Sequence, residues 1–432
     1  MKVLWFSNYY FSDAPDRGTG TWLGTMGRAL VATGEIELFN VVLARVKEIE
    51  EEDSGGIHQY LLPDRWKLGK DQLPAQKYLD EIRQIVKNVG ADLIHVWGLE
   101  SSYFPLLVTR KIIQGENLLE IQGMCYQYSR NYMGGLSAGE QFRCIGLREI
   151  LQPRGILFNG RRSYCRCQTK EEEMVRGFNH ISYQSQWVHD NLIVMGARGK
   201  LHSTGIMLRD AFLSGAKWTW PEESARPVIT TLIRATPYKG LQVLVRAIAI
   251  LKRNGLISPE VQVRVIGNVG RSGPFGLFKQ GYMKWLDQEM KRQHVLQNFV
   301  FLGGQTAEEM ANHLRQSSVF VLPSFCETYC LAAAEAMALG VPCVISYAGA
   351  LPELAEDGKS ALYFPMGDVE ICAKRILDIL NNRDLATRLS ANASETGRRR
   401  NAQRSCVERQ MRIYNEIMLE KHEHGERNRN GK

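Results

Sequence analysis

The chain has 432 residues, a formal net charge of +8, 44% hydrophobic residues and 23% charged residues. This is an ordinary globular composition, and the length allows two or three domains. The longest apolar runs are strand-length, which excludes a membrane helix of about 20 residues. The basic runs lack interleaved aromatic residues and a recognition motif, which excludes the usual nucleic-acid-binding classes.

Short apolar runs alternate with longer helical patterns in two series along the chain. The first series predicts strands at 3–7, 37–43, 93–96 and 118–122, with helices at 22–33 and 76–89. The second predicts strands at 229–233, 261–266, 299–302, 319–322 and 343–346, with helices at 241–254, 282–293 and 307–316. Strands that alternate with helices form right-handed β-α-β units and parallel sheets.

Two such series predict an α/β protein with two Rossmann-like, doubly wound domains that face each other across a cleft. We assign residues 1–215 to the first domain and 216–405 to the second, with the junction between Arg209 and Pro227. A helix near residues 406–421 is expected to pack back on the first domain. Ligands of open parallel sheets bind at the carboxyl ends of the strands, so the site is expected there.

The N-terminus and the cysteines favour a cytoplasmic protein. Residues 1–7 begin a predicted core strand, and no signal-peptide pattern follows. The nine cysteines are odd in number and scattered, and the spacing of Cys165, Cys167 and His180 does not match a zinc site. We therefore expect free thiols, a reducing compartment and no metal site.

The positive charge is concentrated in three places, which are Arg161-Arg162, residues 398–400 and the tail from Lys421 to Lys432. Two interpretations stay open for these runs. They form a solvated surface, or they attract the protein to anionic lipid at the inner face of a membrane.

Two glycine loops follow predicted strands. Gly18 and Gly20 lie between the first strand and the helix at 22–33, where a loop can approach a phosphate closely. The full dinucleotide fingerprint is absent, which argues against a nicotinamide-dependent dehydrogenase. Gly267 and Asn268 follow the strand at 261–266 and form either a flap over a donor substrate or a surface loop.

Arg234 and Lys239 follow the first strand of the second series. Two cations at one strand end can hold a diphosphate between them, because arginine presents a planar fork and lysine a point charge. Taken alone, a lysine at position 239 is more typical of a solvated surface than of a binding site.

The most specific segment runs from Pro323 to Pro342. A helix is predicted to open near Tyr329 and to stop at Gly340, and the free amides at its start favour an anion such as phosphate. Glu335 lies two turns beyond Glu327, about 12 Å along the axis. One carboxylate can then meet a sugar while the other meets a ribose; alternatively, Glu327 caps the helix and Glu335 is solvated.

These residues resemble the donor domain of retaining GT-B glycosyltransferases of glycosyltransferase family 4, of the polysaccharide-biosynthesis type. The resemblance covers residues 229–368 and rests on three elements in order. They are Arg234 with Lys239-Gly240, Glu327 with residues 335–342, and Gly349 with Pro352-Glu353 and Gly358. The first half resembles the acceptor domain of the same family more loosely, through Gly18, Gly20 and the run 92–95.

The resemblance implies a role for each matching residue. Arg234, Lys239 and Glu327 would be catalytic, the two cations at the leaving diphosphate and the carboxylate at the transferring sugar. Glu335 would hold the ribose, the amides of Tyr329, Cys330 and Leu331 would contact phosphate, and Gly18, Gly20, Gly267 and Asn268 would complete the donor site. It also implies a UDP- or GDP-sugar donor, no metal, and front-face attack with retention of configuration.

Two positions depart from the family pattern, and a third is ambiguous. Gln122 stands where the family often has a histidine that contacts the donor sugar, and Thr328-Tyr329-Cys330 stands in place of Gly-Phe-Gly. Glutamine still hydrogen-bonds a hydroxyl but carries no proton charge. His95 ends a predicted strand and is either a core histidine or an acceptor contact.

We therefore predict a hexosyltransferase that extends a cell-surface polysaccharide or a lipid-linked saccharide. Two alternatives stay open. One is a degenerate GT-B protein that serves as a scaffold in polysaccharide assembly, and the other is a GT-B nucleotide-sugar epimerase.

Overall fold

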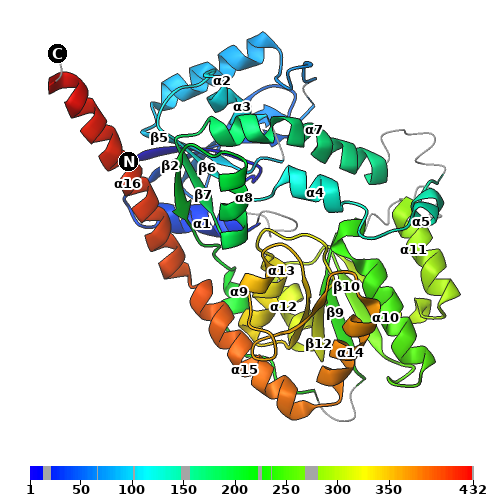
Figure 1. Ribbon diagram of the computed structural model, residues 1–432. Helices are drawn as coiled ribbons and strands as arrows, with labels where there is room; N and C mark the ends of the chain where they lie inside the picture. Colours follow the sequence, from blue (N-terminus) through cyan, green and yellow to red (C-terminus); the bar gives the residue numbers. More distant parts are fainter. Residues whose placement is uncertain are drawn as a thin grey trace.

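The computed structural model describes residues 1–12, 21–65, 67–100, 103–146, 156–221, 226–234, 236–267 and 281–430. Two α/β domains lie one above the other, each with a central sheet between helices (Figure 1). The two domains confirm the predicted fold class.

The first sheet has eight strands in the order β3-β4-β2-β1-β5-β6-β7-β8, parallel except for β3 against β4. Its strands are β1 (Lys2–Ser7), β2 (Glu37–Ala44), β3 (Glu50–Ser54), β4 (Ile57–Pro63), β5 (Leu93–Trp97), β6 (Asn117–Glu120), β7 (His180–Tyr183) and β8 (Lys200–Ser203). Its helices are α1 (Thr21–Val31), α2 (Gln76–Val89), α3 (Phe104–Thr109), α4 (Cys125–Asn131), α5 (Ala138–Arg143), α7 (Ile156–Arg176) and α8 (Gln186–Val194).

The second sheet has six parallel strands in the order β11-β10-β9-β12-β13-β14. They are β9 (Val228–Leu232), β10 (Gln262–Ile266), β11 (Phe299–Gly303), β12 (Val319–Leu322), β13 (Cys343–Tyr347) and β14 (Leu362–Pro365). The helical segments are α9 (Asp210–Leu213), η1 (Pro237–Lys239), α10 (Leu241–Arg253), α11 (Gly281–Arg292), η3 (Leu296–Asn298), α12 (Ala307–Arg315), α13 (Leu331–Leu339), η4 (Leu351–Glu353), α14 (Val369–Leu380) and α15 (Arg383–Arg400).

Strand β1 shows why the first sheet is buried on both faces. Its side chains alternate, so that Val3 and Trp5 enter one apolar cluster while Leu4 and Phe6 enter another. Strands covered by helices on both faces are apolar throughout, as this one is. The cluster that contains Trp5 continues into the second domain, so the two domains share apolar packing.

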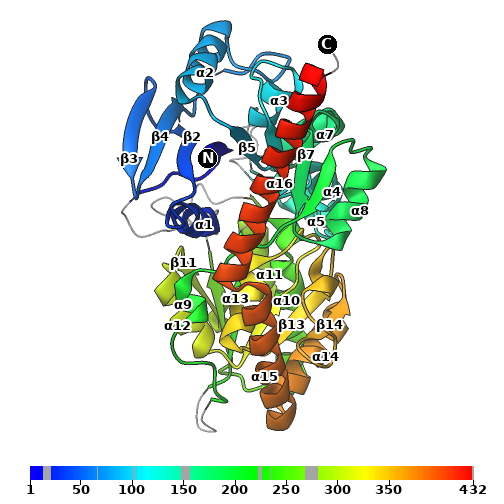
Figure 2. The same cartoon turned by 90° about the vertical axis from the view of Figure 1, so that its left-hand side faces the viewer.

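The last helix, α16 (Gln403–Asn430), returns from the second domain along one side of the first (Figures 1 and 2). The hydroxyl of Tyr414 accepts a hydrogen bond from Trp5 Nε1 at 3.1 Å and lies 2.8 Å from His95 Nδ1. Lys200 at the sheet edge pairs with Glu420 at 2.7 Å. The contacts of α16 described here thus lie on the first sheet.

Two expectations about local structure are corrected. Cys125 and Cys167 form a disulfide between α4 and α7, so the cysteines are not all free thiols. Helix α13 begins at Leu331 rather than near Tyr329, because Cys330 has φ 81 and ψ 84, outside the helical region.

Candidate functional site

Loops from the carboxyl ends of strands in both sheets meet at the junction of the domains. After β12, Thr328 donates its hydroxyl hydrogen to the carbonyl of Gln122, which follows β6, at 2.7 Å. Ser185, which follows β7, donates to the carbonyl of Thr328 at 3.0 Å. The loop with the first predicted glutamate therefore touches the first domain directly.

Lys239 and Glu327 form an ion pair at this junction. Nζ of Lys239 lies 2.7 Å from Oε1 of Glu327, and the two side chains are 19% and 7% exposed. Burial disfavours the lysine charge, but the carboxylate outweighs it and raises the pKa of Lys239 above its ordinary value. Lys239 is therefore a fixed cation at neutral pH, and the solvated alternative for it is wrong.

Two glycines let the three motif segments interlock. A Cβ on Gly240 (φ 77) would lie 1.8 Å from the carbonyl oxygen of Pro323, and a Cβ on Gly349 (φ 58) would lie 2.2 Å from that of Glu327. Only glycine fits such a close approach with a positive φ. The loops after β9 and β13 are thereby held against the loop that carries Glu327.

The start of α13 is strained where the related pattern has glycine. Cys330, a non-glycine residue with φ 81, precedes the helix and gives it no side-chain cap. A left-handed conformation costs an ordinary residue about 1–2 kcal/mol. The hydroxyl of Tyr329 accepts a hydrogen bond from Asn401, and Arg400 lies over its ring.

Glu335 is buried within α13, with 4% of its surface exposed. Its Oε1 accepts hydrogen bonds from Arg209 at 2.7 and 3.3 Å. Burial raises the pKa of Glu335, and the guanidinium of Arg209 opposes that rise. The alternative in which Glu327 caps the helix and Glu335 is solvated is wrong, because Cys330 occupies the capping position and Glu335 is enclosed.

The remaining donor-side predictions fall in different places. Arg234 is exposed after β9, and a Cβ on Gly267 (φ 123) would lie 2.2 Å from the carbonyl oxygen of Ile233. Gly18, Gly20 and Asn268 lie outside the described residues.

His95 and Gln122, predicted as contacts of the acceptor or of the sugar, differ in their surroundings. His95 has no exposed surface, stacks at 4.1 Å between ring centroids on Trp97, and is bonded to Tyr414. Burial lowers the pKa of His95 well below its ordinary value. This is the core-histidine arrangement. Gln122, in contrast, lies at the junction through its contact with Thr328.

Sequence reasoning missed Glu100 and the tyrosines near it. Glu100 follows β5, and the positive charge of Arg234 from the other domain acts on it. Tyr128 of α4 packs against Tyr164 and Tyr238 with centroid distances of 5.2 and 5.5 Å. The spacing of Glu100 after a buried strand was the available signal, because strand ends are where sites form.

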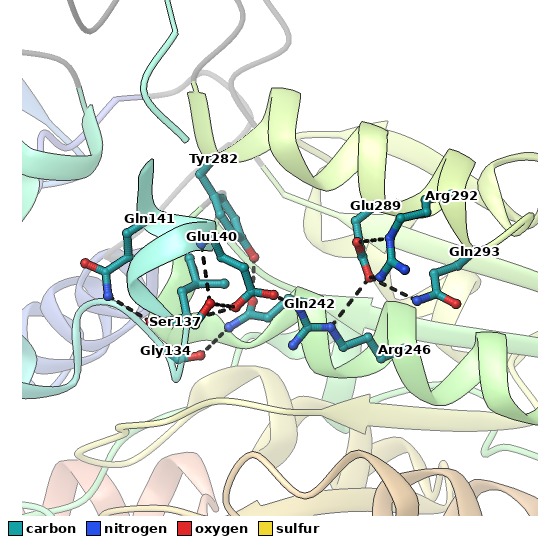
Figure 3. Close-up of polar contacts among 11 residues, drawn as sticks. Gly134, Ser137, Glu140, Gln141, Gln242, Arg246, Tyr282, Glu289, Arg292 and Gln293 are labelled. Carbon is teal, nitrogen blue, oxygen red and sulfur yellow. Dashed lines mark hydrogen bonds and ion pairs between the residues drawn. The ribbon is translucent and has the colours of Figure 1, made fainter. Parts of the chain in front are cut away.

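A second contact between the domains is an arm made of residues 134–143 (Figure 3). Gln242 of α10 donates to the carbonyl of Gly134 at 2.6 Å and accepts from the hydroxyl of Tyr282. Arg246 pairs with Glu140 of α5, and also lies 3.7 Å from Glu289 of α11. The arm therefore fixes first-domain residues onto α10 and α11.

Two absences concern only the part of the chain that the structure describes. Within it, no three or more histidine, cysteine or acidic side chains are grouped as a metal site would need. In the same residues, every helix is too short or too polar to span a bilayer.

Two α/β domains with parallel sheets and a polar site at their facing strand ends define the GT-B class of glycosyltransferase folds. Residues 216–396, which hold Arg234, Lys239, Glu327 and Glu335, match the family Glycosyl transferases group 1.

Related proteins match part of the chain. A D-inositol 3-phosphate glycosyltransferase of Streptomyces scabiei is 30% identical over 176 residues, 40% of this chain and 37% of that protein. A GDP-mannose-dependent alpha-(1-6)-phosphatidylinositol monomannoside mannosyltransferase of Mycolicibacterium smegmatis is 30% identical over 164 residues, 36% of this chain and 39% of that protein. The chain thus spans less than two fifths of the length of these relatives.

Solved structures are similar over nearly the whole chain. A sucrose-phosphate synthase from Thermosynechococcus elongatus has a TM-score of 0.71 and 15% identity, covering 97% of this chain and 99% of its own. Anabaena Alr3699/HepE, in complex with UDP and glucose, has a TM-score of 0.65 and 16% identity, covering 96% and 100%. At such identities the likeness establishes the fold.

Proposed function

We propose that the protein is a retaining hexosyltransferase of glycosyltransferase family 4. It transfers a sugar from UDP- or GDP-sugar to a growing cell-surface polysaccharide or a lipid-linked saccharide. The observation that carries the proposal is the buried Lys239–Glu327 pair at 2.7 Å, held against the start of α13 at the domain junction. The group 1 family match and the UDP complex of Alr3699/HepE support the choice of donor.

Each site residue has a part in this reaction. Lys239 and Arg234 bind the diphosphate and stabilise the charge that develops on it as the sugar leaves. The amides at the start of α13 add the positive end of the helix dipole. Glu335 holds a ribose hydroxyl, with Arg209 fixing its orientation.

Glu327 contacts the transferring sugar and is kept in place by Lys239. The departing phosphate oxygen accepts the proton of the acceptor hydroxyl, which attacks from the same face, so that configuration is retained. No metal is required in this scheme, because two cations and the helix amides supply the positive charge. The glycosyl transfer takes place in the cytoplasm. Where the acceptor is lipid-linked, the protein makes peripheral contact with the inner face of the membrane.

Thermal shift against UDP, GDP, ADP and their sugar conjugates, without added metal, tests the proposal. A ligand at about 100 times its dissociation constant stabilises the folded protein by about 2.7 kcal/mol. We expect one nucleotide to raise the melting temperature selectively, and Arg234→Ala and Lys239→Ala to abolish that rise. Lys291→Ala, at an exposed lysine of α11, is the matched control and keeps it.

If no nucleotide shifts the folded protein, the proposal is wrong and the scaffold alternative takes its place. If the nucleotide binds but its sugar conjugate is not consumed in the presence of saccharide acceptors, the proposal of transferase activity is wrong.

A further inference from the structure

The side chain of Gln242, in the first turn of α10, joins three elements at one point. Its Nε2 donates to the carbonyl of Gly134 in the arm at 2.6 Å and to the carbonyl of Pro237 in η1 at 2.9 Å. Its Oε1 accepts the hydroxyl hydrogen of Tyr282 of α11 at 2.6 Å (Figure 3). Only 1% of Gln242 is exposed, so both hydrogens of its amide group are committed to carbonyls inside the protein.

The two carbonyls that share this amide group come from different domains and lie close together. Gly134 has φ 55, and a Cβ on it would lie 2.1 Å from the carbonyl oxygen of Pro237 and 2.7 Å from Nε2 of Gln242. Buried carbonyl oxygens need a hydrogen-bond donor, and here one side chain serves both. The arm therefore rests on η1 through Gln242.

The turn η1 carries the lysine that the proposed function assigns to the diphosphate. Lys239 is the last residue of η1, two positions after Pro237. The loop after β12 fixes one side of the turn, because the amide of Phe325 donates to the carbonyl of Tyr238 at 2.7 Å. Gln242 fixes the side that faces the first domain. These two contacts together set the position of Lys239.

The arm has a second anchor on α10, made by charge. Arg246, four residues after Gln242, pairs with Glu140 of α5 and also lies 3.7 Å from Glu289 of α11 (Figure 3). Glu140 caps α5 as well, since its Oε2 accepts a hydrogen bond from the amide of Ser137 at 2.8 Å. Residues four apart lie on one face of a helix, so the ion pair holds the arm against the face that carries Gln242.

We propose that Gln242 is a positioning residue for Lys239, and that it holds the lysine at the diphosphate site only while the first-domain arm is docked. This inference rests on the proposed function, in which Lys239 binds the diphosphate, and it adds a residue beyond those that the family pattern names. A nucleoside diphosphate carries one phosphate more than the monophosphate of the same base. The ratio of their dissociation constants therefore reports on the cations at the diphosphate.

Isothermal titration calorimetry with the full chain measures that ratio. The probes are UDP and UMP, or GDP and GMP, according to the base that the thermal shift selects. We expect the wild type to bind the diphosphate at least about tenfold more tightly than the monophosphate, because charge-assisted bonds to phosphate are strong. Gln242→Met removes both donated hydrogen bonds at similar volume. It should lower the ratio at least about threefold while leaving the affinity for the monophosphate nearly unchanged.

Glu140→Gln tests the arm without touching η1. It removes the charge that pairs with Arg246 but keeps an oxygen that can accept the amide of Ser137. It should lower the ratio in the same direction, by about twofold to fivefold, because the arm docks less firmly. Arg292→Gln is the matched control, since it removes the exposed partner of Glu289 on α11 and should keep the wild-type ratio.

A double-mutant cycle shows whether Gln242 acts through Lys239. In Lys239→Ala the cation is absent, so adding Gln242→Met should not lower the ratio further. Hydrogen exchange tests the junction without any ligand. The amide of Gly240 donates to the carbonyl of Pro237 at 2.9 Å, and it should exchange at least about fivefold faster in Gln242→Met. Unchanged exchange would mean that Gln242 does not hold η1. The melting temperature of each variant shows whether it is folded.

Three further outcomes overturn the inference while the wild type still prefers the diphosphate. They are an unchanged ratio in Gln242→Met or in Glu140→Gln, an equal loss of affinity for diphosphate and monophosphate, and an effect of Gln242→Met that persists in Lys239→Ala. A wild type that binds no nucleotide, or that does not prefer the diphosphate, is a different result, because it overturns the proposed function itself.

Discussion

Lys239 and Glu327 form a buried ion pair, so the stability contributed by each charge depends on the other. Each charge is costly to bury alone, and the pair at 2.7 Å compensates both. Removing one partner leaves the other charge without compensation, whereas removing both leaves only a smaller side-chain volume. The pair is therefore a contribution to stability as well as to the proposed binding of the donor.

Lys239→Ala should lower the free energy of unfolding by about 3 kcal/mol, because it strands a carboxylate that is 7% exposed. The double variant Lys239→Ala/Glu327→Ala should lose less than the single one. Urea denaturation of the two single variants and the double variant gives the coupling energy. Additive losses would mean that the two charges do not stabilise each other.

The Cys125–Cys167 bond closes a separation of 42 residues and ties α4 to α7. Closing a loop of this length stabilises a chain by about 4 kcal/mol in the chain-entropy account. Reduction should therefore lower the melting temperature of the wild type, and it should have no effect on Cys125→Ser/Cys167→Ser. Cys165→Ser changes an exposed free cysteine and should behave like the wild type. An unreduced protein in which both thiols react with an alkylating reagent would contradict the bond.

At the scale of elements, much of the architecture follows from patterns in the sequence. The strand at 319–322 and the helix at 76–89 occur as predicted, because each is bounded by clear polar or turn residues. Strand β3 was missed, since the acidic run Glu50–Ser54 has little apolar character. A two-residue turn, in which Gly55 and Gly56 both have positive φ, pairs β3 with β4.

The site could be predicted only in part for a related reason. Lys239 and Glu327 belong to local motifs whose spacing is visible in the chain. The contact between Gln122 and Thr328, the bond between Arg209 and Glu335, and the place of Glu100 depend on how two sheets meet. The spacing of residues within one domain carries no information about how the two sheets are placed relative to each other.

Helix α16 is attached to the first sheet over two buried histidines. Nδ1 of His180 lies 3.1 Å from Nε2 of His202, and Glu416 and Glu420 of α16 lie 3.5 and 3.8 Å from His202 and His180. Burial lowers both pKa values, that of His202 to about 4, while the two glutamates oppose the shift and Lys200 adds to it.

Both imidazoles therefore bind protons more weakly in the folded chain than in the unfolded chain, whose histidine pKa is about 6.5. Their stabilisation is complete above about pH 6.5 and is lost as the pH falls toward the folded values. We expect the free energy of unfolding to drop by about 1–2 kcal/mol between pH 7 and pH 5 from His202. His202→Gln should reduce the drop, and His422→Gln on the exposed part of α16 is the control. Equal drops in wild type and His202→Gln would refute this.

At the scale of the whole molecule, the domains are joined by the shared apolar cluster and by several polar contacts. The polar contacts include the Thr328–Gln122 bond, the arm on α10 and α11 (Figure 3), and Glu353 of η4 at the start of α8. The carboxylate of Glu353 accepts hydrogen bonds from the amides of Gln186 and Trp187, each at 2.7 Å. Charge-assisted bonds at a helix start are among the stronger contacts of this kind.

Glu353→Ala should release the first turn of α8 from the second domain. Hydrogen exchange of the amides of Gln186 and Trp187 should become at least about tenfold faster, since a bond to a charged group contributes about 1.5–3 kcal/mol. Glu356→Ala removes a nearby carboxylate that pairs with Lys359 at the surface, and should leave these amides protected. Unchanged protection in Glu353→Ala would show that the contact does not hold the domains.

The return of α16 to the first domain has a consequence for synthesis. Tyr414, whose hydroxyl contacts both Trp5 Nε1 and His95 Nδ1, is made 319 residues after His95. A ribosome that adds about 5–20 residues per second needs tens of seconds to reach it. During that interval Trp5 and His95 lack the contact with Tyr414, and a nascent chain stalled before residue 403 should bind chaperones that the released protein does not.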